Sequence, residues 1–152
     1  MSPLSIADFA LPATGNTTFK LSNQRGKNVV VYFYPKDNTP GCTTEGQEFR
    51  DLYPEFEKAG TVVVGVSRDS LKSHEGFKAK HGFPFDLLSD TEGTLCERFG
   101  VMKQKNMYGK LVRGIERSTF VFDKTGKLVR EWRGLKAPGH AAEVLAFVQT
   151  LP

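Results

Sequence analysis

Residues 29–45, VVVYFYPKDNTPGCTTE, decide the fold of this 152-residue chain. The run from Val29 to Tyr34 is short, β-branched and aromatic and is followed by a proline, which predicts a buried strand. Thr39 and Pro40 then predict a helix start, because a threonine side chain caps the first turn and proline suits the first helical position. A strand that leads directly into a helix indicates an α/β fold.

Strand and helix patterns alternate along the rest of the chain. Apolar residues at 49, 52, 53 and 56 share one helix face, within which Pro54 predicts a kink or a break. The later elements are predicted as a strand at 61–67, a helix at 71–81, a strand at 85–88, a helix at 91–99, a strand pair at 118–122 and 127–132, and a helix from Pro138 onward. This order indicates one α/β domain, residues 1–152, with a mixed central sheet flanked by helices.

The composition is that of an ordinary folded protein. Hydrophobic residues make up 39% and charged residues 25%, which argues against disorder, and the net charge is +4. No apolar run reaches the length of about 20 residues that a membrane-spanning helix needs, so no membrane partner is expected. Residues 1–8 lack the basic start and apolar stretch of a signal peptide. We therefore expect a cytoplasmic protein.

The two cysteines, Cys42 and Cys96, form no Cys-x-x-Cys pair and have no histidine at zinc-binding spacing, so no metal site is expected. Counting from Pro40 places Cys42 at the third helical position, beside backbone N–H groups without intrahelical acceptors and at the positive end of the helix dipole. That setting stabilises a thiolate relative to a thiol and predicts a nucleophilic cysteine. The alternative is a buried thiol that merely fills the corner between strand and helix.

The spacing Pro35-x-x-x-Thr39-x-x-Cys42, with Arg117 downstream, resembles the active-site signature of the peroxiredoxins. Residues 32–45 as a whole resemble the bacterioferritin comigratory protein group, also called peroxiredoxin Q. The resemblance covers roughly residues 4–151, with further matching stretches at 65–67, 88–90 and 114–120. It implies a thioredoxin-like fold and a peroxidase that needs neither a metal nor an organic cofactor.

The resemblance also implies a role for each residue of the signature. Cys42 attacks one oxygen of hydrogen peroxide or an organic hydroperoxide and becomes a sulfenic acid, the first and reversible oxidation step. Thr39 is expected to hold the peroxide through its hydroxyl group, and Pro35 to shield the thiolate from water. Arg117 is expected to support the thiolate and the charge on the leaving oxygen, unless it is an exposed cation at a strand edge. Glu45 either stabilises the helix start by its charge or anchors this arginine.

Reduction of the sulfenic acid is where the sequence departs from the family. Members that carry a resolving cysteine have it at positions that correspond to Gln47 or Lys78, and neither is cysteine here. Cys96 is the remaining candidate, and its predicted helix places it on a half-buried apolar stripe. We favour a one-cysteine mechanism, recycled by thioredoxin, glutaredoxin or a small thiol, over a Cys42–Cys96 disulfide reduced by thioredoxin. By the same resemblance, the protein is expected to be a monomer or a weak homodimer.

Other cysteine enzymes have less support in the sequence. A disulfide reductase would need a second cysteine three residues after Cys42, where the chain has Glu45. A cysteine hydrolase would need a histidine base. His74 and His81 are expected to be exposed on a polar helix, and His140 stands near the start of the last helix.

A nucleic-acid-binding role would rest on one basic segment around residues 106–109, NMYG. Its cations are Lys103, Lys105, Lys110, Arg113 and Arg117. We interpret the segment instead as an exposed loop near the active site and expect no nucleic-acid partner. Lys36 and Asp37 are likewise expected to lie in an exposed loop.

Overall fold

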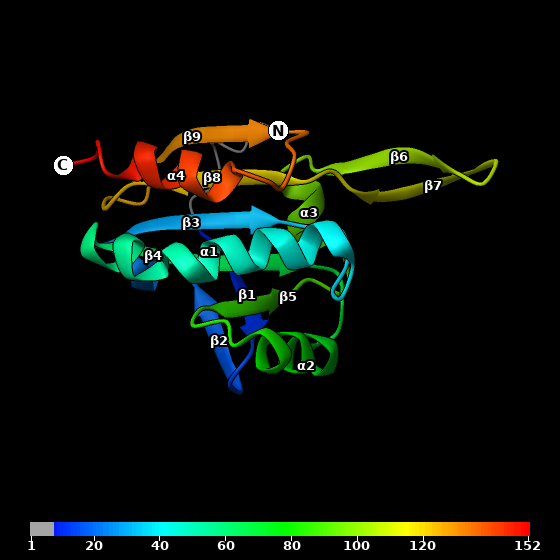
Figure 1. Cartoon of the computed structure of the whole chain (residues 1–152), viewed down its shortest axis with the longest axis horizontal. Helices are drawn as coiled ribbons and strands as arrows, with labels where there is room; N and C mark the ends of the chain where they lie inside the picture. The colour runs from blue at the N-terminus through cyan, green and yellow to red at the C-terminus, as the bar shows by residue number, and fades with distance from the viewer. Residues whose placement is uncertain (1–7) are drawn as a thin grey trace.

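A seven-stranded mixed sheet forms the centre of the protein (Figure 1), whose computed structural model describes residues 8–152. In spatial order the strands are β2 (Thr17–Lys20), β1 (Ala10–Ala13), β5 (Asp86–Ser89), β4 (Thr61–Ser67), β3 (Asn28–Phe33), β8 (Ser118–Phe122) and β9 (Leu128–Arg133). The strands β3, β4 and β5 run parallel, whereas β1, β2, β8 and β9 join by antiparallel pairing. The mixed sheet predicted from the sequence is confirmed.

Helices cover both faces of the sheet. They are α1 (Pro40–Lys58), α2 (Leu71–His81), α3 (Thr94–Arg98) and α4 (His140–Val148), with a short 3-10 turn, η2 (Leu21–Gln24). Val30 and Tyr32 of β3 pack in the core formed with α1, α2 and α4, whereas Val31 and Phe33 pack in the core formed with α3. Figure 1 shows α1 and α4 next to each other on one face of the sheet. Both faces of β3 are buried, which explains its unbroken apolar run.

Residues 102–115 form a two-stranded hairpin, so the prediction of a loop was wrong. The strands β6 (Met102–Met107) and β7 (Lys110–Ile115) pair along their whole length. The turn between them has φ of 54° at Tyr108 and 80° at Gly109, the positive values that a two-residue type I′ turn requires. The strands β1 and β2 were also not predicted. The other predicted helices and strands are present, with ends that differ by a few residues.

Helix α1 continues through Pro54, so the predicted break does not occur. Proline removes one helical hydrogen bond and costs about 3 kcal/mol. Phe49 and Phe56 lie on either side of it and are both 0% exposed, and burying each ring contributes about 2 kcal/mol. Packing on the core therefore holds the helix together. Although α1 spans 19 residues, no helix within residues 8–152 is long and apolar enough to cross a membrane.

Candidate active site

Cys42 lies where the chain passes from the carboxyl end of β3 into α1. It is the third residue of the helix, as the sequence predicts, and only 2% of its surface is exposed. Backbone N–H groups in this first turn have no intrahelical acceptor, and they point toward the positive end of the helix dipole. The position therefore favours a negative charge on the cysteine sulfur.

Thr39 precedes the helix but does not cap it with its side chain, so that part of the prediction was wrong. Its hydroxyl donates a 2.8 Å hydrogen bond back to the carbonyl oxygen of Lys36, while its own carbonyl accepts from the backbone N–H of Thr43 at 2.9 Å. Asn38 has φ of 62°, a left-handed conformation that asparagine tolerates. The loop is thus bent tightly just before the helix. Pro35, half-buried, begins this loop directly after Tyr34.

Arg117 comes just before β8 and meets Cys42 from the neighbouring strand. Its Nη2 lies 3.5 Å from Cys42 Sγ, and its Nη1 donates a 2.7 Å bond to Glu45 Oε1. The arginine side chain is 15% exposed and the glutamate side chain 0%, so neither is an ordinary surface charge. Gly41 leaves room for this contact, since a Cβ there would lie 2.9 Å from Arg117 Nη2. The structure thus joins three of the predicted site residues, Cys42, Glu45 and Arg117.

Burial raises the pKa of Glu45 to about 7, although the charge of Arg117 opposes that increase. For Arg117, burial alone would lower the pKa, but the neighbouring Glu45 and Cys42 outweigh it, and the pKa is raised. Glu45 Oε2 has no hydrogen-bond partner among residues 8–152. Of the two interpretations of Glu45, the structure favours the anchor for Arg117.

Cys96 lies on the other side of the sheet from Cys42. It packs with Phe99 and Phe120 in the core under α3, whereas Cys42 belongs to the core under α1. It is fully buried, not half-buried as predicted. Burial, together with a hydrogen bond to Asp90, raises the pKa of this thiol well above its usual range. The environment of Cys96 is that of an unreactive core thiol.

A buried hydrogen bond between Asp37 and His74 fixes the loop before Cys42, and sequence reasoning missed it. Asp37 and His74, both predicted to be exposed, are 4% and 0% exposed, with His74 Nδ1 2.7 Å from Asp37 Oδ2. Tyr34 Oη donates to Asp37 Oδ1 at 2.6 Å, and Ser73 Oγ donates to Asp37 Oδ2 at 2.7 Å. His74 Nε2 donates to the carbonyl oxygen of Leu88 at 2.9 Å, so the ring is held between α2, the loop and β5.

The pKa of Asp37 responds to this network. Burial alone would raise it, but the hydrogen bonds from His74, Tyr34 and Ser73 outweigh burial and leave the pKa lowered. The pair ties the active-site loop to α2. Asp37 and His74 are 37 residues apart, so no short stretch of the sequence contains both and indicates that they pair.

Asp37, Asp69 and His74 also bring three potential metal-ligand atoms within 4.8 Å of one another. These atoms already have hydrogen-bond partners. Asp69 Oδ2 accepts from the backbone N–H of Asp37 at 2.6 Å and from Ser67 Oγ at 3.2 Å. The cluster is therefore explained as a polar network that orders the loop.

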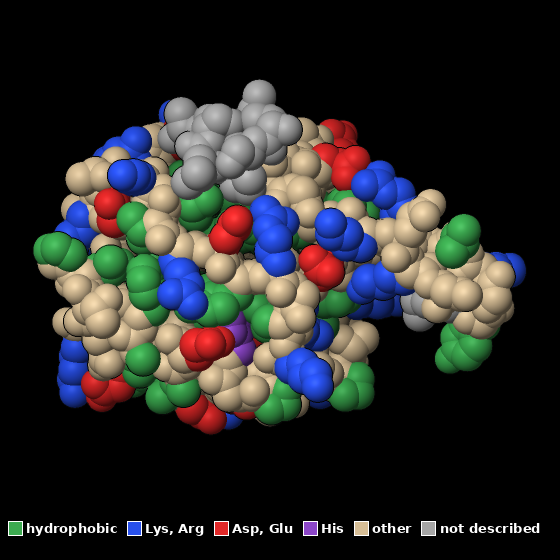
Figure 2. Space-filling model, turned by 90° about the horizontal axis from the view of Figure 1, so that it is seen from above, with side chains coloured by type: hydrophobic (Ala, Val, Ile, Leu, Met, Phe, Trp, Pro, Cys, Tyr) green, Lys and Arg blue, Asp and Glu red, His purple; other side chains and the backbone are tan. Residues whose placement is uncertain are grey.

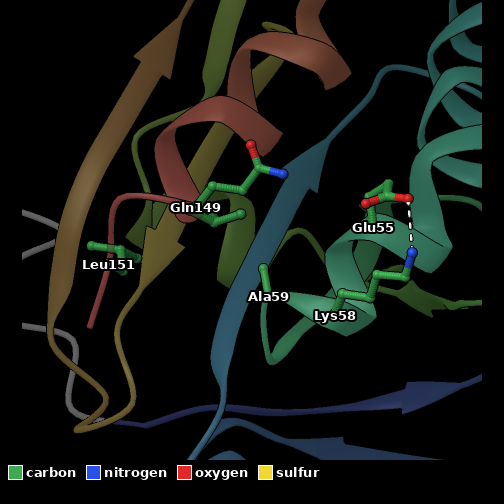
Figure 3. A pocket seen from close by; sticks show the side chains of 6 residues that line it. Glu55, Lys58, Ala59, Gln149 and Leu151 are labelled. Carbon is green, nitrogen blue, oxygen red and sulfur yellow. Dashed lines mark hydrogen bonds and ion pairs between the residues drawn. The ribbon is translucent and has the colours of Figure 1, made fainter.

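A surface hollow of about 250 Å³ lies at the opposite end of α1 from Cys42 (Figure 3). Glu55 and Lys58 line it from α1, Ala59 from the residue that follows this helix, and Gln149 and Leu151 from the end of the chain. The helix between this hollow and Cys42 is about 20 Å long. The hollow offers no thiol and is not part of the candidate active site.

Known proteins resemble this chain over nearly its whole length. The AhpC/TSA family matches residues 5–131. Peroxiredoxin Bcp of Xanthomonas campestris is 54% identical over 147 residues, which cover 97% of this chain and 92% of that protein. Peroxiredoxin Bcp of Bacillus subtilis is 51% identical over 144 residues, which cover 95% and 92%.

Solved structures show the same fold. The bacterioferritin comigratory protein of Xanthomonas campestris, described for its alkyl peroxide reduction activity, has a TM-score of 0.88 and 53% identity and covers 93% of this chain and 90% of its own. Two further structures, of Xanthomonas campestris peroxiredoxin Q, are serine variants of two different cysteines.

The chain belongs to the AhpC/TSA family, with the thioredoxin-like fold of the peroxiredoxins. The relatives named above share more than 50% identity with it and are Bcp or peroxiredoxin Q proteins. It is therefore a peroxiredoxin of the Bcp group and a thiol-dependent peroxidase.

Proposed function

We propose that Cys42 is the peroxidatic cysteine of this peroxidase. Its thiolate sulfur attacks one oxygen of the peroxide, so that an S–O bond forms and the O–O bond breaks. The other oxygen leaves as hydroxide or alkoxide and takes up a proton to give water or an alcohol. The observation that carries this proposal is the nearly buried guanidinium of Arg117, 3.5 Å from Cys42 Sγ. A fixed positive charge there stabilises the thiolate before the attack and the leaving oxygen during it.

Thr39 supports the proposal from the substrate side. Because its hydroxyl hydrogen is directed to the carbonyl oxygen of Lys36, the lone pairs of the hydroxyl oxygen can accept a hydrogen bond from the peroxide O–H. Pro35 places an apolar ring without an N–H group at the start of the same loop, which suits a role in limiting the access of water. Neither a metal nor an organic cofactor takes part in the proposed step.

The proposed substrates are hydrogen peroxide and organic hydroperoxides. The alkyl peroxide reduction activity described for the Xanthomonas relative supports the organic class. A thiol that must be reduced again after each turnover suits a reducing compartment, which favours the cytoplasm. We propose that the chain works there as a single domain, residues 1–152, and as a monomer or a weak homodimer.

A one-cysteine mechanism fits this chain better than an internal disulfide. Cys96 is buried in the opposite core, and Gln47 occupies one of the two positions where family members carry a resolving cysteine. The two cysteines replaced in the Xanthomonas structures are separated by a fixed number of residues. The same separation after Cys42 reaches Lys78, which is the other position where family members carry a resolving cysteine. The proposed reductant is therefore an external thiol, namely thioredoxin, glutaredoxin or a small thiol.

Peroxide consumption with dithiothreitol as the thiol donor tests the assignment. Cys42→Ser is expected to reduce the rate to that of dithiothreitol alone, whereas Cys96→Ser should stay within about twofold of the unaltered chain. The proposal fails if folded Cys42→Ser still turns over, or if Cys96→Ser loses activity as completely as Cys42→Ser.

A further inference from the structure

The β6–β7 hairpin carries exposed apolar side chains. Tyr108 is 101% exposed, Leu111 70% and Val112 39%, and these are the large exposed hydrophobic residues among the side chains that the structure describes. The hairpin projects from the body as a two-stranded ribbon (Figure 1), and apolar side chains stand out on it in the space-filling view (Figure 2). Burying apolar surface against a partner is favourable, so this arm has the character of a binding surface.

The hairpin also carries the excess charge of the protein. Residues 102–115 contain four cations, Lys103, Lys105, Lys110 and Arg113, and no Asp or Glu. The whole chain has a net charge of +4, so the remainder of the sequence is balanced. Arg113 pairs with Glu97 of α3 at 2.7 Å, so Lys103, Lys105 and Lys110 are the cations of the hairpin that would attract a partner with a negatively charged surface.

The hairpin leaves the body beside the candidate active site. β7 ends at Ile115, two residues before Arg117, whose guanidinium contacts Cys42 Sγ. The next strand begins at Ser118, which pairs with Phe33 at the carboxyl end of β3, the end from which the chain continues to α1. The strands have six residues each, which gives the arm a length of about 20 Å.

We propose that the β6–β7 hairpin is the docking arm for an acidic dithiol protein that reduces oxidised Cys42. This inference rests on the proposed function, which requires an outside donor because Cys96 lies on the opposite face. One thiolate of the donor attacks the sulfur of the Cys42 sulfenic acid, so that the S–S bond of a mixed disulfide forms and the S–O bond breaks. Hydroxide leaves and takes up a proton from the solvent to become water. The second donor thiol attacks the donor's own sulfur in that bond. This releases Cys42 as a thiolate, and the donor, oxidised by two electrons, keeps the disulfide.

A docking arm would help a protein donor to reach Cys42, of which only 2% is exposed. A protein thiol can reach this sulfur only when the first turn of α1 opens, and such local openings are brief. A donor already held by the hairpin is present at high effective concentration when the opening occurs. A compact protein of about 100 residues has a radius of gyration of about 13 Å, so one donor can contact both the hairpin and Cys42.

Other occupants fit less well. Nucleic acid would pair with the cations and could stack on Tyr108, but it would leave the aliphatic side chains of Leu111 and Val112 exposed, whereas a protein partner can bury them. A second copy of this chain would bring an equally cationic hairpin and an otherwise balanced surface. An acidic protein with an apolar patch matches both properties of the arm.

The test compares the double variant Lys110→Glu/Leu111→Ser with Lys27→Glu, an exposed lysine next to the other end of β3. Oxidation of Cys42 by hydrogen peroxide and turnover with dithiothreitol should stay within about twofold in both variants. With thioredoxin, its reductase and NADPH, or with glutaredoxin and glutathione, kcat/KM for the protein donor should fall about tenfold or more in the double variant only.

Equal kcat/KM values for the double variant and the unaltered chain would overturn the docking role. So would an unaltered chain that dithiothreitol reduces but that neither protein donor reduces. Loss of DNA binding in the double variant, with donor kinetics unchanged, would assign the arm to nucleic acid instead. Failure of the underlying peroxidase proposal would look different, because Cys42 of the unaltered chain would then not be oxidised by peroxide.

Discussion

Cys42 and Cys96 are separated by the central sheet, each within the hydrophobic core of a different face. A disulfide needs Cα atoms about 4.4–6.8 Å apart with Cβ atoms that face each other. Opening the first turn of α1 would expose Cys42 but would leave Cys96 behind β3 and β8. In the folded structure, an internal disulfide would therefore also require Cys96 and α3 to leave the opposite core.

The first prediction concerns the product of oxidation. One equivalent of hydrogen peroxide should add a single oxygen atom to Cys42, and mass spectrometry of the intact chain should show no loss of two hydrogens. Excess peroxide without a thiol should carry the same cysteine on to the sulfinic acid. Detection of a Cys42–Cys96 peptide after digestion would contradict the separation of the two thiols.

The second prediction concerns Arg117. Arg117→Met should slow single-turnover oxidation of Cys42 about 100-fold, because it removes a fixed positive charge from the reacting sulfur. Arg117→Lys keeps the charge but cannot bond Cys42 and Glu45 together, so its rate should lie between the two. Combining Arg117→Met with Glu45→Gln controls for the stability lost when a buried carboxylate has no partner. A rate unchanged in Arg117→Met would remove the arginine from the mechanism.

The third prediction concerns the space beneath that arginine. Gly41→Ala would place a Cβ 2.9 Å from Arg117 Nη2, so the guanidinium must shift away from Cys42. We expect Cys42 oxidation to slow about tenfold. Gly76→Ala in α2 is the matched control, since its Cβ meets no atom within 4 Å, and it should raise helix stability by about 1 kcal/mol without changing the rate. Equal rates in both variants would show that the position of Arg117 is not critical.

The fourth prediction is a pH dependence of stability that Glu45 causes. Burial raises its pKa to about 7, above the value of about 4.3 in unfolded chains. Its contribution to stability is thus complete below about pH 4 and is lost as the pH rises through 7. Glu45→Gln should match the unaltered chain at pH 4 and exceed its free energy of unfolding at pH 8 by on the order of 3 kcal/mol. Urea titrations at both pH values that give the same difference would contradict this account.

The fifth prediction concerns the Asp37–His74 pair. Asp37→Asn should lower the free energy of unfolding at pH 7 by about 3 kcal/mol, because it removes the charged acceptor of the buried hydrogen bonds from His74, Tyr34 and Ser73. The lowered pKa of Asp37 means that this stabilisation exists above about pH 4, the unfolded value, and is lost as the pH falls further through the folded value. Ser73→Ala removes one neutral hydrogen bond from the same carboxylate and should cost about 1 kcal/mol. An equal decrease in the free energy of unfolding in Asp37→Asn and Ser73→Ala would mean that the bond between Asp37 and His74 adds no more stability than an ordinary hydrogen bond.

Local sequence patterns predicted the parts of the fold on which the site depends. The apolar run that ends at Tyr34 and the Thr39-Pro40 helix start are short-range signals, and they placed Cys42 correctly at the third helical position. The contact between Arg117 and Cys42 was expected only from the family resemblance. The pairing of β3 with β8 brings Arg117 and Cys42 together, and no sequence pattern around either residue predicts that pairing.

The parts that were missed are those whose signals are weak or distant. Strands β1 and β2 have four residues each, and the hairpin is exposed along most of β7, so neither shows the clear alternation of a half-buried strand. His74 lies on a helix with little apolar character, and its partner Asp37 comes from a loop elsewhere in the chain. Such a pair is visible only once the chain is folded.

Because the excess positive charge lies on one hairpin, ionic strength should affect the two half-reactions of the enzyme, oxidation of Cys42 and its reduction by the donor, to different degrees. Hydrogen peroxide is uncharged, so oxidation of Cys42 should be nearly independent of added salt. Docking of an acidic donor acts across solvent, where charges are screened over about 8 Å at 0.15 M salt. The step that limits turnover should therefore shift toward reduction as the ionic strength of the surroundings increases.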